Sequence, residues 1–118
     1  MMNKMGKTIC LWVDDLRDPP MRMDTEYLVA RSVNQAKALL DMAEHEAWAD
    51  KIDYISIDHD AGIYAVAGGD YINLLNWLEY RQHTENGKVY PVHIHSFNPI
   101  GVVNMRAIIE NNGWEEIR

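Results

Sequence analysis

Three apolar, β-prone runs of this 118-residue chain each stop abruptly at polar residues. The first run, residues 8–13, reads Thr-Ile-Cys-Leu-Trp-Val and ends at two aspartates, and residues 52–57 and 89–95 form later runs of the same kind. Continuous apolar runs of this length are typical of strands buried on both faces. Because helical segments separate the runs, we expect a mostly parallel sheet with right-handed crossovers. Ligands bind such sheets beyond the carboxyl ends of the strands.

The segments between the strands carry the start signals and the periodicity of helices. Ser32 opens a capping-box pattern, which predicts a helix that follows a second strand at residues 27–31 and runs to about Trp48. Asp70 is expected to cap a second helix that ends near His83. The last residues, after a third helix, are expected to form a short fifth strand or a tail.

Two segments are expected to form loops. Residues 16–26 contain Pro19 and Pro20, and consecutive prolines exclude a long regular helix. Residues 61–70 include three glycines and are expected to form a mobile loop over the end of the third strand. A loop in that position could act as a lid over a ligand.

Composition limits the classes of partner. The formal net charge is −7, whereas proteins that bind duplex DNA or membrane surfaces in general present a basic face, so neither is expected here. Cys10 is the only cysteine, which excludes an intramolecular disulfide and predicts a reducing compartment. The apolar runs are too short for a signal peptide or a membrane span, which predicts a cytoplasmic protein. The length favours a single domain over residues 1–118.

The acidic residues that follow the strands are the candidate metal ligands. Asp14 and Asp15 follow the first strand, and Asp58 and Asp60 follow the third. Two like charges about 4 Å apart repel each other by roughly 4 kcal/mol at an effective dielectric of about 20, so carboxylates gathered at one edge need protonation or a cation. Oxygen ligands in a partly open site suit Mg²⁺, or Mn²⁺ in its place.

Groups that bind anions are expected at the same edge. Asn98 is a favoured helix cap and Pro99 suits the first helical turn, which predicts a helix that stops near Gly113. The free backbone N–H groups and the positive dipole end of that helix favour a phosphate. Arg17, just after the first acidic pair, is a second candidate for holding the phosphate, and Ser96 lies beside the helix start.

The histidines leave two interpretations open. His93 and His95 lie two residues apart on one strand and share a face, so with His59 they could form a zinc site. Carboxylates outnumber imidazoles at this edge, which favours Mg²⁺ or Mn²⁺ over zinc. His95, at the strand end, is the candidate that contacts the ligand and acts as an acid or base, whereas His93 is expected to be a core histidine.

The order of these residues resembles the response-regulator receiver domain over about residues 7–112. The resemblance implies that Asp14 and Asp15 hold Mg²⁺, that Asp58 accepts a phosphoryl group, and that Ser96 contacts it. It also implies a three-layer α/β fold of receiver or flavodoxin-like type, with a mostly parallel sheet of about four to five strands. The first helix of that fold is reduced here to the proline-containing loop.

One departure from the receiver pattern bears on function. No lysine follows Lys88, so nothing fills the position that receivers keep for a lysine in the last strand. Ordinary phosphorelay signalling is therefore not expected.

A closer resemblance is to the cyclic-phosphate-processing receiver domains. It rests on three motifs: Asp14-Asp15-Leu16-Arg17, Asp58-His59-Asp60, and His95-Ser96-Phe97-Asn98-Pro99-Ile100-Gly101 with Asn104-Met105. The resemblance implies a metal-dependent phosphohydrolase or phosphodiesterase that acts on a cyclic phosphate, either a phosphate-containing small molecule such as a nucleotide or an RNA end.

The leading hypothesis gives each residue a role. The four aspartates hold Mg²⁺ directly or through water, or Asp58 instead attacks phosphorus. His95 protonates the leaving oxygen, and Arg17, Ser96 and Asn98 position the phosphate. The alternative is a non-enzymatic receiver-like module that binds a protein partner or a phosphorylated ligand. Turnover distinguishes the two, and the sequence alone identifies neither the substrate nor a partner.

Overall fold

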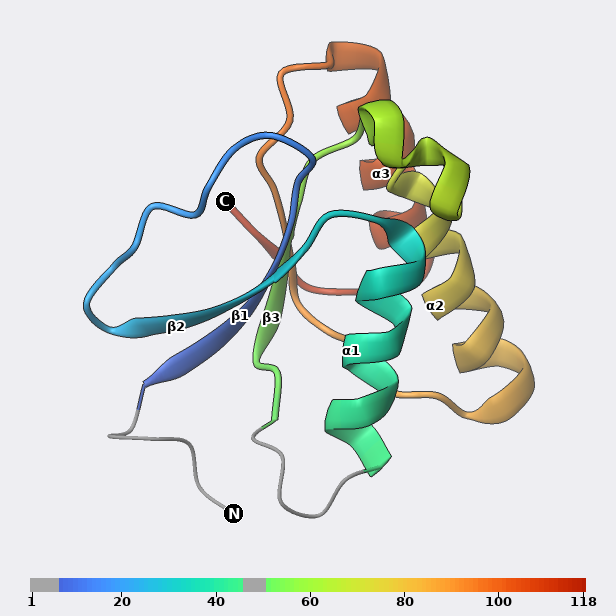
Figure 1. Cartoon of the computed structure of the whole chain (residues 1–118). Helices are drawn as coiled ribbons and strands as arrows, with labels where there is room; N and C mark the ends of the chain where they lie inside the picture. The colour runs from blue at the N-terminus through green and yellow to red at the C-terminus, as the bar shows by residue number, and fades with distance from the viewer. Residues whose placement is uncertain (1–6, 46–50) are drawn as a thin grey trace.

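A computed structural model describes residues 7–45 and 51–118. The described residues form a parallel sheet in the order β2-β1-β3-β4-β5 (Figure 1). The strands are β1 (Thr8–Val13), β2 (Thr25–Ala30), β3 (Tyr54–Ile57), β4 (Val92–Ile94) and β5 (Glu116–Ile117). The helices are α1 (Val33–His45), the 3-10 helix η2 (Gly62–Ala67), α2 (Ile72–Glu85) and α3 (Pro99–Asn111). The predicted parallel α/β fold of receiver or flavodoxin-like type is confirmed.

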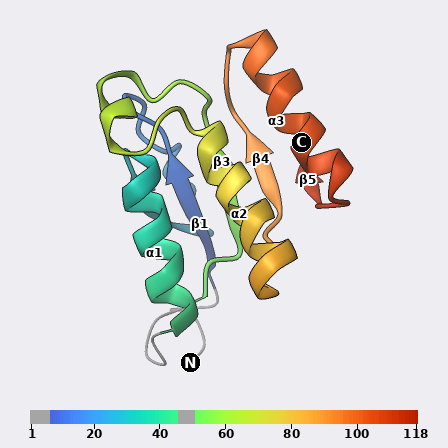
Figure 2. The same ribbon diagram turned by 90° about the vertical axis from the view of Figure 1, so that its right-hand side faces the viewer.

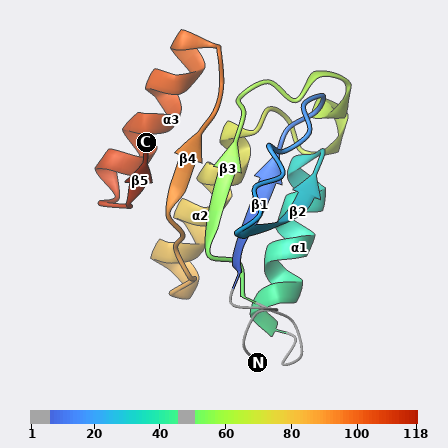
Figure 3. The same ribbon diagram turned by 90° about the vertical axis from the view of Figure 1, so that its left-hand side faces the viewer.

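All the α-helices of the described residues lie on one face of the sheet. Figure 2 shows them in front of the strands, and Figure 3 shows the strands in front of them. The third layer implied by the receiver resemblance is reduced to the loop between β1 and β2, because Pro19 and Pro20 interrupt any helix there. Within the described ranges, no helix is long and apolar enough to cross a membrane.

The hydrophobic core lies between the sheet and these helices. Alternate residues of the central strands point into it and are almost fully buried, namely Ile9, Leu11 and Val13 of β1 and Ile55 and Ile57 of β3. Burying an aliphatic side chain of this size contributes about 1.5–3 kcal/mol. The helical periodicity expected after Ser32 is confirmed by the burial of Val33, Ala36 and Leu40 on one face of α1, whereas the predicted end of this helix near Trp48 lies outside the described residues.

The opposite face of the sheet is covered mainly by its own side chains and the β1–β2 loop. Trp12 stacks parallel to His95 with ring centroids 4.0 Å apart, and it meets Tyr27 edge to face. Cys10 and Ser56 are buried beside them, and Cys10 carries a free thiol. This face is therefore aromatic and polar, in contrast to the aliphatic core on the helical side.

The helix starts agree with the sequence in two cases and differ in one. Asn98 caps α3, since its Oδ1 accepts a hydrogen bond from the Gly101 N–H at 3.0 Å. Ser32 Oγ accepts from the Gln35 N–H at 3.0 Å, at the start of α1. The prediction that Asp70 caps the second helix is wrong. Its carboxylate accepts instead from the Ala61 N–H at 3.0 Å and ties down the segment that precedes η2.

The acidic site at the carboxyl edge of the sheet

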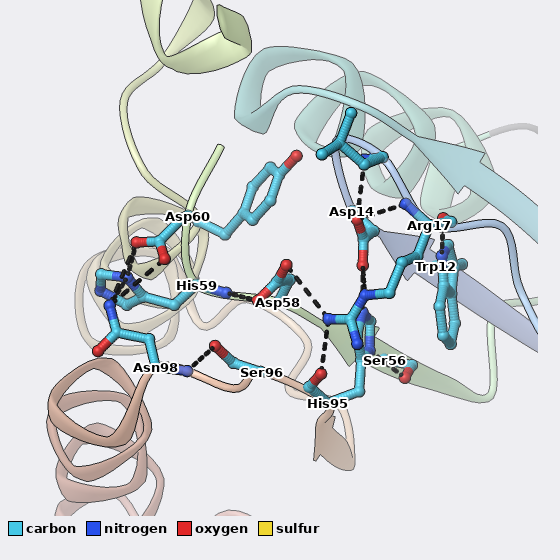
Figure 4. Close-up of polar contacts among 12 residues, drawn as sticks. Trp12, Asp14, Arg17, Ser56, Asp58, His59, Asp60, His95, Ser96 and Asn98 are labelled. Atoms are coloured by element: carbon cyan, nitrogen blue, oxygen red, sulfur yellow. Dashed lines mark hydrogen bonds and ion pairs between the residues drawn. The ribbon is translucent and has the colours of Figure 1, made fainter. Parts of the chain in front are cut away.

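The ends of β1, β3 and β4 bring the predicted site residues together. These strands are neighbours in the sheet, so the residues that follow them meet at one edge (Figure 4). One carboxylate oxygen from each of Asp14, Asp15 and Asp58 lies within 4.8 Å of the others. A pocket of about 380 Å³ is lined by every predicted site residue except His95, together with Leu16 and Phe97. We call it the acidic pocket.

Asp14 is the most enclosed member of the site. Its Oδ1 accepts the backbone N–H groups of Leu16 and Arg17, both at 2.9 Å. Its Oδ2 lies 3.1 Å from Arg17 Nε and 2.9 Å from His95 Nε2. Burial alone would raise the pKa of Asp14, but these hydrogen bonds hold it below its ordinary value. Asp14 is therefore an ionised carboxylate whose oxygens are already well supplied with donors.

Arg17 lies between two of the carboxylates. Besides contacting Asp14, its Nη2 lies 3.3 Å from Asp58 Oδ2 and donates to the His95 carbonyl at 2.8 Å. Trp12 Nε1 donates to the Arg17 carbonyl at 2.9 Å and fixes the backbone at this point. Part of the repulsion between the acids is thus offset by an internal cation, and Arg17 is engaged with the protein as well as lining the pocket.

Asp15 differs from its neighbours in having unmatched charge. Among the described residues, no ion pair includes it. Burial, followed by the charges of Asp14 and Asp58, raises the pKa of its carboxyl group. Gly62 adopts a φ of +56° against it, and a Cβ on Gly62 would lie 2.5 Å from Asp15 Oδ2. A cation would relieve the charge on Asp15, and three carboxylates form an oxygen donor set that fits Mg²⁺ or Mn²⁺.

The motif Asp58-His59-Asp60 divides between two clusters. Asp58 Oδ1 accepts the His59 N–H at 2.7 Å and faces Arg17. Asp60 Oδ1 lies 2.8 Å from His59 Nδ1, and Asn98 Nδ2 donates to Asp60 at 3.3 Å. The hydrogen bond from His59 lowers the pKa of Asp60. Asp60 therefore lines the pocket but groups with His59 rather than with the three other predicted metal ligands.

His95 points toward the helix-free face of the sheet. Its Nε2 faces the Asp14 carboxylate, which can only accept, so Nε2 carries the proton. Its Nδ1 lies 2.8 Å from Ser56 Oγ, and this oxygen lies 3.0 Å from His93 Nδ1. Burial lowers the pKa of His95 and so favours the neutral ring, although the neighbouring Asp14 carboxylate acts in the opposite direction. Both ring nitrogens are thus engaged within the protein, and the side chain is only 9% exposed.

The two anion-binding candidates next to α3 lie at the pocket wall. Ser96 Oγ accepts the Asn98 N–H at 3.1 Å, while Asn98 caps the helix. The zinc combination is not formed, because none of the possible metal-binding groups of the described residues joins His59 to His93 or His95.

A family model for the cyclic-phosphate processing Receiver domain matches residues 9–111. The chain belongs to this family. No curated protein and no solved structure gives a significant match. The family match confirms the resemblance drawn from the three motifs, and it associates this receiver domain with cyclic-phosphate processing.

Sequence reasoning missed three residues that brace the site of the receiver domain: Arg31, Tyr71 and Ser56. Arg31 Nη1 donates to the Asp14 and Arg17 carbonyls, both at 3.1 Å, and Tyr71 Oη donates to the Arg31 carbonyl at 2.7 Å. Ser56 connects the two histidines. A signal was present for two of them: Arg31 follows β2 as Asp14 follows the adjacent β1, and Ser56 faces His93 across the β3–β4 pair.

Proposed function

We propose that this receiver domain is a metal-dependent phosphohydrolase or phosphodiesterase that opens a cyclic phosphate on a nucleotide or an RNA end. The observation that carries the proposal is the meeting of three carboxylates with the start of α3 in one pocket. Carboxylates hold a divalent cation, and a helix amino terminus attracts a phosphate. The association of the family with cyclic-phosphate processing supports the choice of substrate.

Asp15 and Asp58 are the proposed direct metal ligands. Asp15 carries the unmatched charge of the pocket, and within the described part of the chain Asp58 Oδ2 has only the 3.3 Å contact with Arg17. Asp14 supports them from behind, because four donors already contact its two oxygens. When bound, Mg²⁺ or Mn²⁺ would supply charge neutralisation on the phosphate and an acidified water. Asp60 would not contact the metal directly but would lie near the phosphate.

The groups at the start of α3 would hold the phosphate. The Ser96 hydroxyl and the Asn98 side chain line the pocket and would donate hydrogen bonds to a phosphate oxygen, and the dipole of α3 favours the negative charge. Arg17 would exchange its 3.3 Å contact with Asp58 for a phosphate oxygen once a cation neutralises Asp58. Asp58 then acts either as a metal ligand or as the nucleophile toward phosphorus.

His95 receives a different role from the one expected from sequence. Its two nitrogens are engaged with Asp14 and Ser56, so it has no free nitrogen with which to protonate a leaving group. We assign it as a positioning residue that orients Asp14 and, through Asp14, Arg17. Loss of His95 should therefore weaken activity through a misplaced Asp14.

The test is a panel of cyclic mononucleotides, cyclic dinucleotides and RNA ends bearing cyclic phosphates, assayed with Mg²⁺, Mn²⁺ or EDTA. We expect turnover only with metal, and a loss of at least about 100-fold in Asp15→Asn and Asp58→Asn, since a lost metal contact costs several kcal/mol in the transition state. Asp24→Asn is the matched control, because Asp24 is exposed and does not line the acidic pocket. Activity that survives both EDTA and Asp58→Asn would contradict the proposal.

The second candidate function is a non-enzymatic module that binds a phosphorylated ligand or a protein partner. This function is favoured because both ring nitrogens of His95 contact other side chains, Ser56 and Asp14, so His95 cannot serve as the general acid in the pocket. Metal-dependent binding of a panel member, without turnover, would support it.

A further inference from the structure

One large apolar side chain at the acidic pocket has no role in the fold. Phe97, the only phenylalanine of the chain, lines the pocket and is 88% exposed. A ring this exposed gains nothing from the hydrophobic core, and small-molecule pockets are lined predominantly by apolar and aromatic side chains. Leu16, also exposed, is the other apolar residue of the pocket.

One face of the Phe97 ring lies against the Arg17 guanidinium. The Arg17 guanidinium lies 4.8 Å from the ring centroid, and the same guanidinium is held by Asp14, Asp58 and the His95 carbonyl. A cation over an aromatic face is a favourable arrangement that orients the ring. Because the side chain remains exposed, the rest of the ring surface is available to a ligand.

The sequence places this ring beside the phosphate-binding groups. Phe97 lies between Ser96 and Asn98, the hydroxyl and the helix cap at the start of α3. A ligand whose phosphate reaches the helix start therefore has its remaining atoms near an aromatic surface. The pocket volume, about 380 Å³, falls within the range of small-molecule sites, which is roughly 300–1,000 Å³.

We propose that Phe97 is a stacking platform for a nucleobase, so that the receiver domain selects cyclic phosphates that carry a base over those that do not. This inference rests on the proposed function and specifies its substrate class. The base stacks on the ring while the cyclic phosphate lies at Ser96 and the start of α3. The net charge of −7 disfavours a long RNA and favours contact with one terminal nucleotide or a free cyclic mononucleotide.

The experiment compares two substrates that share a cyclic phosphate, 2′,3′-cyclic AMP and glycerol 1,2-cyclic phosphate. Stacking of a base on an aromatic side chain corresponds to roughly 5- to 150-fold in affinity. We expect Phe97→Ala to raise KM for 2′,3′-cyclic AMP by that factor and to leave KM for the glycerol compound unchanged. Because stacking is present in both ground and transition states, kcat should change little.

Three further variants sharpen the comparison. Phe97→Trp should restore KM and Phe97→Leu should not, since the leucine is apolar but offers no ring. Ile100→Ala is the matched control, because Ile100 is 74% exposed at the start of α3 and does not line the pocket. A short RNA that ends in a 2′,3′-cyclic phosphate tests the second source of the same ligand.

Equal effects of Phe97→Ala on both substrates, full rescue by leucine, or an equal effect of Ile100→Ala would each overturn the inference. If wild-type protein hydrolyses nothing, the proposed function fails separately. The same comparison is then made by equilibrium dialysis of the two compounds in Mg²⁺. A base-dependent affinity that is lost in Phe97→Ala would still support the platform, and equal affinities would overturn it.

Discussion

Two charged clusters of this receiver domain are built on opposite principles. Near the amino ends of the strands, the Glu44 carboxylate accepts hydrogen bonds from the Arg81 guanidinium and the Tyr90 hydroxyl, so one acid meets one base. At the carboxyl edge three carboxylates meet, and Arg17 contacts two of them, Asp14 and Asp58. The first cluster is balanced and needs nothing further, whereas the second keeps a surplus of negative charge that folding does not require.

The pKa shifts express the same difference. Burial would raise the pKa of Glu44, but Arg81 and Tyr90 hold it below its ordinary value. The pKa of Asp15 is raised, by burial and then by the neighbouring carboxylates. A charge that the protein leaves unmatched in its native state is best explained by a ligand that matches it, which is why we assign structure to the first cluster and function to the second.

The largest expected effect is on the balanced cluster. Arg81→Leu should lower the free energy of unfolding by about 3–5 kcal/mol, because it leaves the Glu44 carboxylate buried without its cation. Urea denaturation measures the loss. The matched control is Arg22→Leu, which breaks the exposed Arg22–Asp24 pair and should cost less than about 1 kcal/mol. Equal losses in the two variants would mean that the Glu44–Arg81 pair contributes no more to stability than an exposed ion pair does.

A smaller effect is expected from metal at the acidic pocket. Mg²⁺ or Mn²⁺ at 100 times its dissociation constant should raise the free energy of unfolding by about 2.7 kcal/mol. Asp15→Asn should abolish this response and should also stabilise the metal-free protein, since it removes the unmatched charge. Thermal melting with and without metal tests both, with Asp24→Asn as a control that keeps the response. An unchanged melting temperature at millimolar metal would contradict the metal site.

The contrast between the clusters explains what the sequence could and could not predict. The meeting of Asp14, Asp15 and Asp58 was predictable, because a parallel sheet brings the residues that follow neighbouring strands to one edge, whichever way their side chains point. The cap at Asn98 was predictable for a similar reason, since it depends on local geometry alone.

Side-chain direction was not predictable in the same way. His95 lies at the expected strand end, but Trp12 and Ser56, both distant in sequence, draw its ring to the helix-free face. Asp70 has a capping residue's chemistry, yet the Ala61 N–H offers its carboxylate another donor. The Glu44–Arg81 pair joins two helices, and its residues are 37 positions apart in the sequence, so no local sequence pattern predicts it. Tertiary partners decided each of these outcomes.

The pH dependence of stability should separate the clusters by sign. The lowered pKa of Glu44 means that its contribution is complete above its ordinary pKa of 4.5 and is lost as the pH falls through the lower folded value. The raised pKa of Asp15 has the reverse effect, so stability falls as the pH rises from 3.8 through the higher folded value. In denaturation experiments across this pH range, Glu44→Gln should remove a contribution to stability that rises with pH. Asp15→Asn should remove a contribution that falls with pH. Parallel slopes would contradict the contrast.

The smallest expected change concerns phosphoryl donors. Small donors should leave no long-lived phosphoaspartate at Asp58, although the receiver resemblance implies that Asp58 accepts a phosphoryl group. Its Oδ2 faces Arg17, and no lysine follows Lys88 to couple the phosphate to a conformational switch. Intact mass spectrometry after incubation with acetyl phosphate and Mg²⁺ should therefore show only the unmodified chain, with Asp58→Asn as the blank. A persistent phosphoform absent from Asp58→Asn, with a change in hydrogen exchange around α3, would restore a signalling role. The surplus charge at the carboxyl edge would then serve a receiver switch instead of a substrate.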